Sequence, residues 1–418
     1  PQTIPSDTTF TLPITVVEEA PAIDGVIGPH EWPGGVVATD FLQLEPRQGE
    51  PASERTEVLV MQDQRAIYVA FRVFDSGEPV AQITRRDAEI TSDDAVGFNL
   101  DTYRDRQTGY SFLTNLLGTQ QDLRIADDGR TVDLAWDGEW ESAAARTDYG
   151  WSAEFAIPFS TLRYEPGEDR SWGINFGRTI RRNLEVSFWA GPVDLPFRMS
   201  QAGVLSGLQL PRPLKPAEVI VYGLSRAGTG QDTEWDGGAD LRLNPDPSVT
   251  INGTVNPDFA TIEADREQVN LTRFEVSLTE KRPFFLEGNE LYRQRIRTFY
   301  SRRISDIRGG GRVLGKRGPW TYAAMAVGGE PATDGDPAPF YAVGSLRRDI
   351  GRSTVGATWA ERRLDGEGSG SFGVDATLFF SDHFGFTGQA IQSFGAFDSG
   401  TTAFFLRPAY DSPTGHFH

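Results

Sequence analysis

Apolar and polar residues alternate in short runs through residues 1–212, and Gly, Pro, Asp and Asn separate these runs. Residues 55–74 (RTEVLVMQDQRAIYVAFRVF) form two alternating runs around a polar turn, which predicts a β-hairpin. Residues 94–101 (DAVGFNLD) and 150–162 (GWSAEFAIPFSTL) predict two more strands, the second ended by Pro158. Because helical periodicity is nearly absent, this half of the chain is predicted to be an antiparallel β-sandwich.

Longer alternating runs follow residue 212, after a proline-rich segment (residues 211–218) that we interpret as a linker. One side of each run is rich in Phe, Tyr, Trp, Ala and Gly, and the other in Thr, Ser, Gln, Asp or Arg. This pattern fits either a barrel wall that faces lipid or a soluble sheet with one wet face. Both interpretations predict an all-β chain with two domains, 1–212 and 213–418. The runs cover residues 217–225, 319–329, 339–349, 353–363, 371–382, 383–395 and 401–410.

The segment 252–292 joins the two patterns and carries three motifs, NPDF (256–259), EADREQVNLTRFE (263–275) and EKRPFFLEG (280–288), followed by YSRRI (300–304). Together they resemble a family in which an extracytoplasmic sandwich precedes an outer-membrane β-barrel. The resemblance implies that 213–418 is an antiparallel β region related to part of such a barrel. It also implies a location in the periplasm or outer membrane of a Gram-negative-type bacterium.

The two ends of the chain bear on this expectation. The sequence starts without Met and without an apolar leader, as a mature exported product would. It stops in what reads as another strand (SPTGHFH), so the barrel-like region is expected to be incomplete or truncated.

Besides the hairpin, residues 1–212 contain the segments AIDGVIGPHEW (22–32), SDDAVGFNLD (92–101), RQTGY (106–110), GWSAEFAIP (150–158), WGINF (172–176) and VSFWAGP (186–192). Together these segments resemble carbohydrate-binding module family 9 over nearly the whole of residues 1–212. The resemblance implies sugar binding through aromatic faces framed by polar groups. Trp189 matches one of the two stacking tryptophans of that family, but the other position is Thr91. The acidic and amide ligand positions are Gly97 and Gly177.

Trp136 and Trp140 offer a substitute platform for a sugar, with Asp137 and Glu139 as acceptors for its hydroxyl groups. If this segment is a strand, both tryptophans lie on the same face. The alternative is that both rings pack into the sandwich, since aromatic residues dominate β cores.

Calcium is the one cofactor that the sequence suggests. Asp101, Asp105 and Asp122 flank turns, and carboxylates clustered in loops can hold this hard cation. The alternative is that they are solvated turn residues.

A basic stretch contrasts with the acidic whole. Residues 281–317 contain eleven Lys or Arg and three acids, whereas the chain has a net charge of −19. Arg302, Arg303 and Arg308 are the candidate contacts to anionic headgroups or to an acidic partner. Alternatively, the arginines form the polar row on the inner side of a β region.

The remaining features narrow the function. The acidic balance argues against nucleic-acid binding, and the absence of Cys excludes thiol nucleophiles and zinc thiolates. No catalytic motif is present, so we predict that the protein is not an enzyme. We predict a non-catalytic extracytoplasmic binding or scaffold protein that docks on a membrane-associated assembly or the cell surface. The alternatives are a glycan-binding outer-membrane surface protein and a barrel for transport or anchoring.

Overall fold

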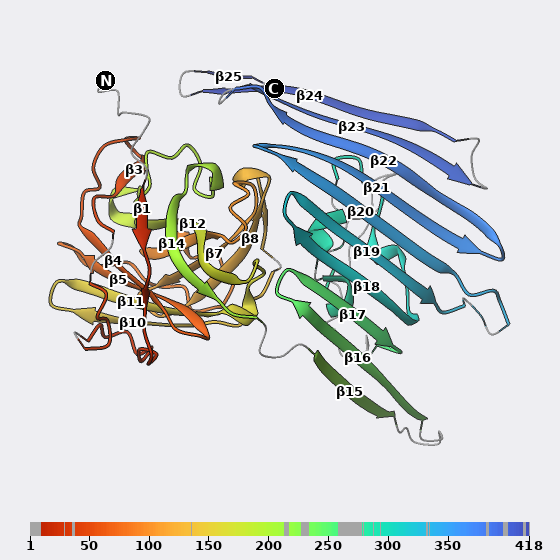
Figure 1. Cartoon of the computed structure of the whole chain (residues 1–418), viewed down its shortest axis with the longest axis horizontal. Helices are drawn as coiled ribbons and strands as arrows, with labels where there is room; N and C mark the ends of the chain where they lie inside the picture. The colour runs from red at the N-terminus through yellow and green to blue at the C-terminus, as the bar shows by residue number, and fades with distance from the viewer. Residues whose placement is uncertain are drawn as a thin grey trace. The chain divides into compact units, whose positions relative to one another are not determined.

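The computed structural model describes residues 10–28, 30–35, 38–134, 136–212, 217–226, 234–257, 278, 280–286, 288–292, 294–331, 333, 335–381, 384–395, 400–412 and 415–417. The chain divides into two compact units, Pro1–Leu214 and Lys215–His418 (Figure 1). The division falls inside the proline-rich segment. Both units are built from β-strands, so the predicted all-β class is confirmed. No helix in the described ranges is long and apolar enough to span a membrane.

The first unit consists of two sheets, which confirms the predicted sandwich. The nine-stranded sheet follows the path β1 (Thr11–Pro13), β14 (Gly203–Leu210), β12 (Gly167–Ile180), β6 (Ala95–Asp101), β7 (Gly109–Asn115), β8 (Gln120–Ala126) and β9 (Thr131–Asp133), with β13 (Glu185–Phe188) on β12 and β3 (Leu42–Glu45) on β13. The five-stranded sheet has the order β10 (Glu141–Thr147), β11 (Gly150–Pro158), β5 (Ala66–Phe74), β4 (Thr56–Gln62) and β2 (Thr15–Val16). The predicted hairpin is β4–β5, and the other two predicted strands are β6 and β11.

Aromatic rings from both sheets meet in the core of the sandwich. The ring of Phe71 on β5 lies 5.7 Å from Phe155 on β11 and 6.0 Å from Phe176 on β12. Phe155 lies 5.3 Å from Phe98 on β6. Large rings bury much apolar area, so these contacts hold the sheets face to face.

A buried ion pair also joins the sheets. Arg178 on β12 reaches Asp75, which follows β5, with Nη2 and Oδ2 3.0 Å apart and both side chains inaccessible to solvent. The guanidinium also donates to the backbone oxygens of Arg55 and Phe74. Because its charge is both paired and hydrogen-bonded, Arg178 can lie inside the sandwich.

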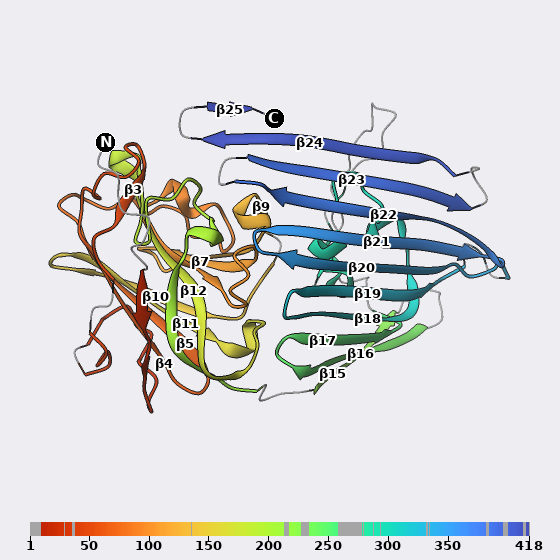
Figure 2. The same cartoon turned by 45° about the horizontal axis from the view of Figure 1, so that its top comes forward.

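The second unit is one sheet of eleven antiparallel strands in sequence order (Figure 2). The strands are β15 (Ala217–Arg226), β16 (Glu234–Asp246), β17 (Val249–Val255), β18 (Ile307–Arg317), β19 (Trp320–Gly329), β20 (Phe340–Ile350), β21 (Ser353–Leu364), β22 (Glu367–Phe379), β23 (Phe384–Gly395), β24 (Thr402–Ser412) and β25 (Gly415–Phe417). The seven alternating runs correspond to β15 and β19–β24, so these strand predictions are confirmed.

The run 263–275 and the last two residues of NPDF lie outside the described residues. The Gly309–Gly311 run lies inside β18, next to a register shift between Ile307 and Gly309. A Cβ atom at Gly310 would meet the Ala326 backbone oxygen at 2.7 Å, so close strand packing explains this glycine.

Candidate functional site

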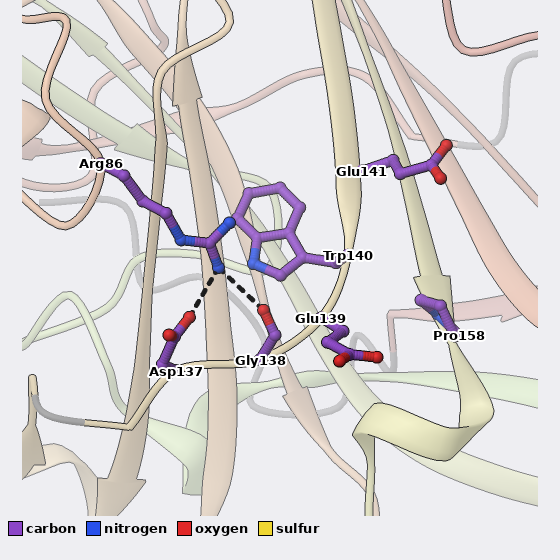
Figure 3. Close-up of a pocket in the computed structure, with 7 residues that line it drawn as sticks. All are labelled: Arg86, Asp137, Gly138, Glu139, Trp140, Glu141 and Pro158. Carbon is purple, nitrogen blue, oxygen red and sulfur yellow. Dashed lines mark hydrogen bonds and ion pairs between the residues drawn. The ribbon is translucent and has the colours of Figure 1, made fainter. Parts of the chain in front are cut away.

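A pocket of about 570 Å³ lies on the sandwich and is lined by charged side chains around Trp140 (Figure 3). Asp137, Glu139 and Glu141 are exposed to solvent and supply carboxylates. Arg86 enters from the loop before β6, and its Nη2 donates to Asp137 Oδ1 and to the Gly138 oxygen, each over 2.8 Å. The pocket therefore offers acceptors and one guanidinium to a ligand rich in hydroxyl or amino groups.

Asp122 on β8 lies directly behind this lining. Its Oδ2 accepts from Trp140 Nε1 at 2.5 Å and lies 3.2 Å from Arg86 Nη2. Burial is the main cause that raises the pKa of Asp122 to about 6, and the hydrogen bond from Trp140 opposes it. Arg86 thus links a buried carboxylate to the exposed Asp137.

The predicted aromatic platform is wrong. Residues 136–140 form a loop before β10, not a strand. The Trp140 ring is buried and stacks on Phe155 at 5.7 Å with an interplanar angle of 8°. Trp136 is partly buried against Tyr110, with ring centroids 4.9 Å apart. Of the four predicted residues, the structure brings Asp137, Glu139 and Trp140 to the pocket, whereas Trp136 packs on the core.

Trp189 does not provide a stacking surface either. It is 6% exposed, and its ring contacts Phe10 at 5.1 Å and Phe176 at 5.6 Å. The rings of Phe10 and Phe176 pack against Trp189, so its indole ring cannot stack on a sugar.

The ligand positions of the sugar-binding family are filled as well. Gly97 on β6 and Gly177 on β12 are direct cross-strand partners. A Cβ atom at Gly97 would come within 2.8 Å of Leu113 Cγ, and one at Gly177 within 2.8 Å of Phe188 Cε1. The side chains of Leu113 and Phe188 thus occupy the space in which the family's acid and amide would stand.

The structure does not assemble the predicted calcium ligands. Asp101 accepts backbone N–H groups of residues 103, 105 and 106, Asp105 accepts those of 107 and 108, and Asp122 binds Trp140. Across the described ranges, no group of three or more acidic, His or Cys residues is placed to hold a metal ion. Asp101 and Asp105 therefore act as turn-forming acceptors, whereas Asp122 lies in a strand and accepts from the Trp140 indole.

On the second unit, one face of the sheet is apolar. Register places Tyr322, Leu346, Ala357, Val374, Ala390 and Phe404 in one row across β19–β24. Cross-strand partners point to the same side, so the row lies on one face, which we call the outer face. Phe404 is 73% exposed. Further exposed residues on this face are Val219, Val221, Leu241, Ile251, Val255, Trp320, Phe340, Ile350, Trp359, Phe372, Phe384, Phe394, Leu406 and Tyr410.

The opposite, inner face carries polar side chains, among them Arg312, Lys316, Thr358, Asp375 and Gln389. Lys316 Nζ lies 2.6 Å from Asp349 Oδ2 on this side. The inner face is mixed, because on β18–β20 it also carries the buried apolar side chains of Leu314, Ala323, Met325, Val327 and Val343.

The arginine and lysine residues of the basic stretch (281–317) differ in burial. Arg312 and Lys316 are buried on the inner face, as in the alternative interpretation. Arg302 in η7 (Ser301–Arg303) is partly buried, 3.9 Å from Glu280, whereas Arg303 and Arg308 are exposed. Only Arg303 and Arg308 of the three predicted contact residues therefore present a largely exposed side chain.

Sequence reasoning missed Arg86 and Glu141. Arg86 lies 51 residues before Asp137 and carries no local motif, so only the loop arrangement brings it there. Glu141 directly follows Trp140, and this position next to the tryptophan pair is the sequence signal that could have identified it. In the structure, Glu141 is exposed at the start of β10.

The comparisons with known proteins each match only part of the chain. Residues 219–311 match a family described as a domain of unknown function (DUF5916). No curated protein matches the chain. Among solved structures, the chain is similar to a carbohydrate binding module family 9 from Caldicellulosiruptor kristjanssonii. In complex with cellotriose, that module shows 15% identity and a TM-score of 0.34, covering 47% of this chain and 92% of the module. In complex with glucose, the module shows 15% identity and a TM-score of 0.35, and the match covers 49% of this chain and 100% of the module.

Proposed function

We propose that this protein is a non-catalytic binding protein held at a membrane by its second unit, in the outer membrane of a Gram-negative-type bacterium. The observation that carries the proposal is the outer face. Exposed Phe, Trp, Leu, Ile and Val side chains extend across it from β15 to β24. Contiguous apolar area of this kind marks a membrane or protein contact.

The arrangement of the two faces favours lipid as the contact. Apolar side chains outward and polar ones inward are the pattern of strands that cross a bilayer. In hydrocarbon every backbone polar group needs a partner, so insertion also requires partners for the edge strands of the sheet. The exposed Arg303 and Arg308 would contact anionic headgroups or an acidic partner.

Flotation with vesicles of phosphatidylcholine and phosphatidylglycerol tests the proposal on the full chain. Wild type should float, and Leu346→Asp and Phe404→Asp should float less, because each places a charge on the outer face. Leu117→Asp is the matched control: Leu117 is 52% exposed on the sandwich and Leu346 is 46% exposed. Wild type that stays in the aqueous fraction, or outer-face variants that float fully, would overturn the proposal.

A second function, glycan binding by the sandwich, is supported by the pocket at Arg86. Three exposed carboxylates and a guanidinium surround an open volume there, and such groups bond sugar hydroxyls. The sequence resemblance of residues 1–212 supports glycans as the ligand class. Since the described residues of this site offer no open aromatic face, hydrogen bonds would have to supply the recognition.

Affinity electrophoresis through soluble polysaccharides tests glycan binding. Retardation of wild type should be lost in Asp137→Ala and Glu139→Ala and kept in Glu78→Ala, an exposed acid outside the pocket. No retardation of wild type by any polysaccharide, or equal retardation of all variants, would contradict this function.

A further inference from the structure

A segment of the chain packs on the inner face of the sheet. We call residues 280–304, apart from 287 and 293, the inner segment; it contains α1 (Pro283–Leu286), η6 (Asn289–Tyr292) and η7. Its first half is apolar: Phe284, Phe285, Leu291 and Tyr292 form a cluster with residues of β18–β20. This half is therefore attached to the sheet by apolar burial.

The second half of the inner segment is held by hydrogen bonds to β21–β23. Gln294 Nε2 donates to Thr358 Oγ1 over 2.9 Å and to Asp375 Oδ1 over 2.8 Å. The Gln389 amide binds both backbone groups of Ile296: it accepts from the N–H at 2.7 Å and donates to the oxygen at 3.0 Å. Thr358 is only 1% exposed and Gln389 only 4%.

A buried ionic cluster fixes the two ends of the inner segment to each other. Arg282 Nη2 lies 2.8 Å from Glu280 Oε2, and Ser301 Oγ donates to the same oxygen over 2.7 Å. Arg282 Nη1 donates to the backbone oxygen of Ile304 over 2.7 Å. The inner segment is thus a closed loop with one apolar and one polar attachment to the sheet.

We propose that the inner segment is a plug: with the outer face against lipid, it fills the polar side and blocks the passage of ions. This inference rests on the proposed membrane function. Thr358, Asp375 and Gln389 are the kind of side chains that would line a water-filled passage, and they bind the inner segment instead. The polar half is where the plug opens, because water can replace its hydrogen bonds more readily than it can replace apolar contacts.

Ion flux through vesicles that carry the full-length protein tests the plug. Wild type should be nearly closed, and the double variant Gln294→Ala, Gln389→Ala should raise the flux by about tenfold or more, as the loss of several hydrogen bonds implies. Gln392→Ala is the control, since Gln392 lies on the opposite face of β23 and should leave the flux unchanged. Wild type that conducts freely, or a double variant that stays closed, would overturn the inference.

A cross-linking experiment separates failure of the plug from failure of the membrane function. The chain has no Cys, so Gln294→Cys with Thr358→Cys provides the two thiols for a short bifunctional thiol reagent. Efficient intramolecular cross-linking is expected with or without vesicles, and Gln392→Cys with Gln294→Cys should not cross-link. Protein that cross-links but does not float refutes the membrane function and with it the ion block. Protein that floats but does not cross-link refutes the plug alone.

Discussion

Trp140 Nε1 donates a hydrogen bond to Asp122 Oδ2 over 2.5 Å, immediately behind the pocket of the sandwich. Within the described part of the chain, the other oxygen, Oδ1, is buried and has no hydrogen-bond partner. A carboxylate with only part of its bonding capacity satisfied is costly to bury when charged. This relationship makes Asp122 a pH-sensitive support of the pocket.

Asp122→Asn should flatten the pH dependence of stability. Burial raises the pKa of Asp122 from 3.8 to about 6, so the folded state binds the proton more tightly than the unfolded state. Its stabilising contribution is present below pH 3.8 and is lost as the pH rises through about 6. A shift of this size corresponds to about 3 kcal/mol. Urea unfolding at several pH values checks the difference between wild type and variant; parallel profiles would contradict the assignment.

Arg178→Ala should destabilise the sandwich by about 1–3 kcal/mol, because it leaves the buried Asp75 Oδ2 without this donor, although Arg182 still pairs with Asp75 Oδ1. Arg146→Ala is the control: Arg146 lies 2.8 Å from Glu78, but both side chains are more than half exposed, so a change below about 1 kcal/mol is expected. Tryptophan fluorescence during denaturation measures both. Equal losses of stability in the two variants would show that the buried pair of Arg178 and Asp75 contributes no more than an exposed ion pair.

Gly97→Ala should cost about 1–3 kcal/mol, because the added Cβ overlaps packed neighbours. Gly344→Ala serves as comparison, since a Cβ atom there would meet nothing within 4 Å. Thermal unfolding followed by circular dichroism compares the two variants. Full tolerance of Gly97→Ala would mean that the family's ligand position is still open.

Lysine substitutions on the outer face should depend on depth. Val374→Lys in the middle of β22 should weaken vesicle partitioning by about 2–4 kcal/mol, and Tyr410→Lys near the end of β24 by about 0–1 kcal/mol. Titration of the protein with vesicles gives both values. Equal weakening at both positions would contradict insertion of the outer face into the bilayer.

The sequence by itself determined the strands and their two sides. Alternation has a period of two residues, so it can be read locally, and Trp151, Ala153 and Phe155 of β11 all pack in the core cluster of the sandwich. The same local rule assigned the apolar outer side of β19–β24, whereas the inner side of β19 and β20 is also apolar, with Met325, Val327 and Val343. Asp137 and Glu139 were found because they adjoin a conspicuous tryptophan pair.

Only the tertiary structure decided which aromatic residues are buried and which segments meet. Trp189 reads as a binding residue, but its ring faces Phe10, which is far from it in sequence. Arg86 at the pocket and Gln389 against Ile296 likewise depend on contacts between distant parts of the chain. Such contacts are set by how the sheets and loops pack, and no local period encodes them.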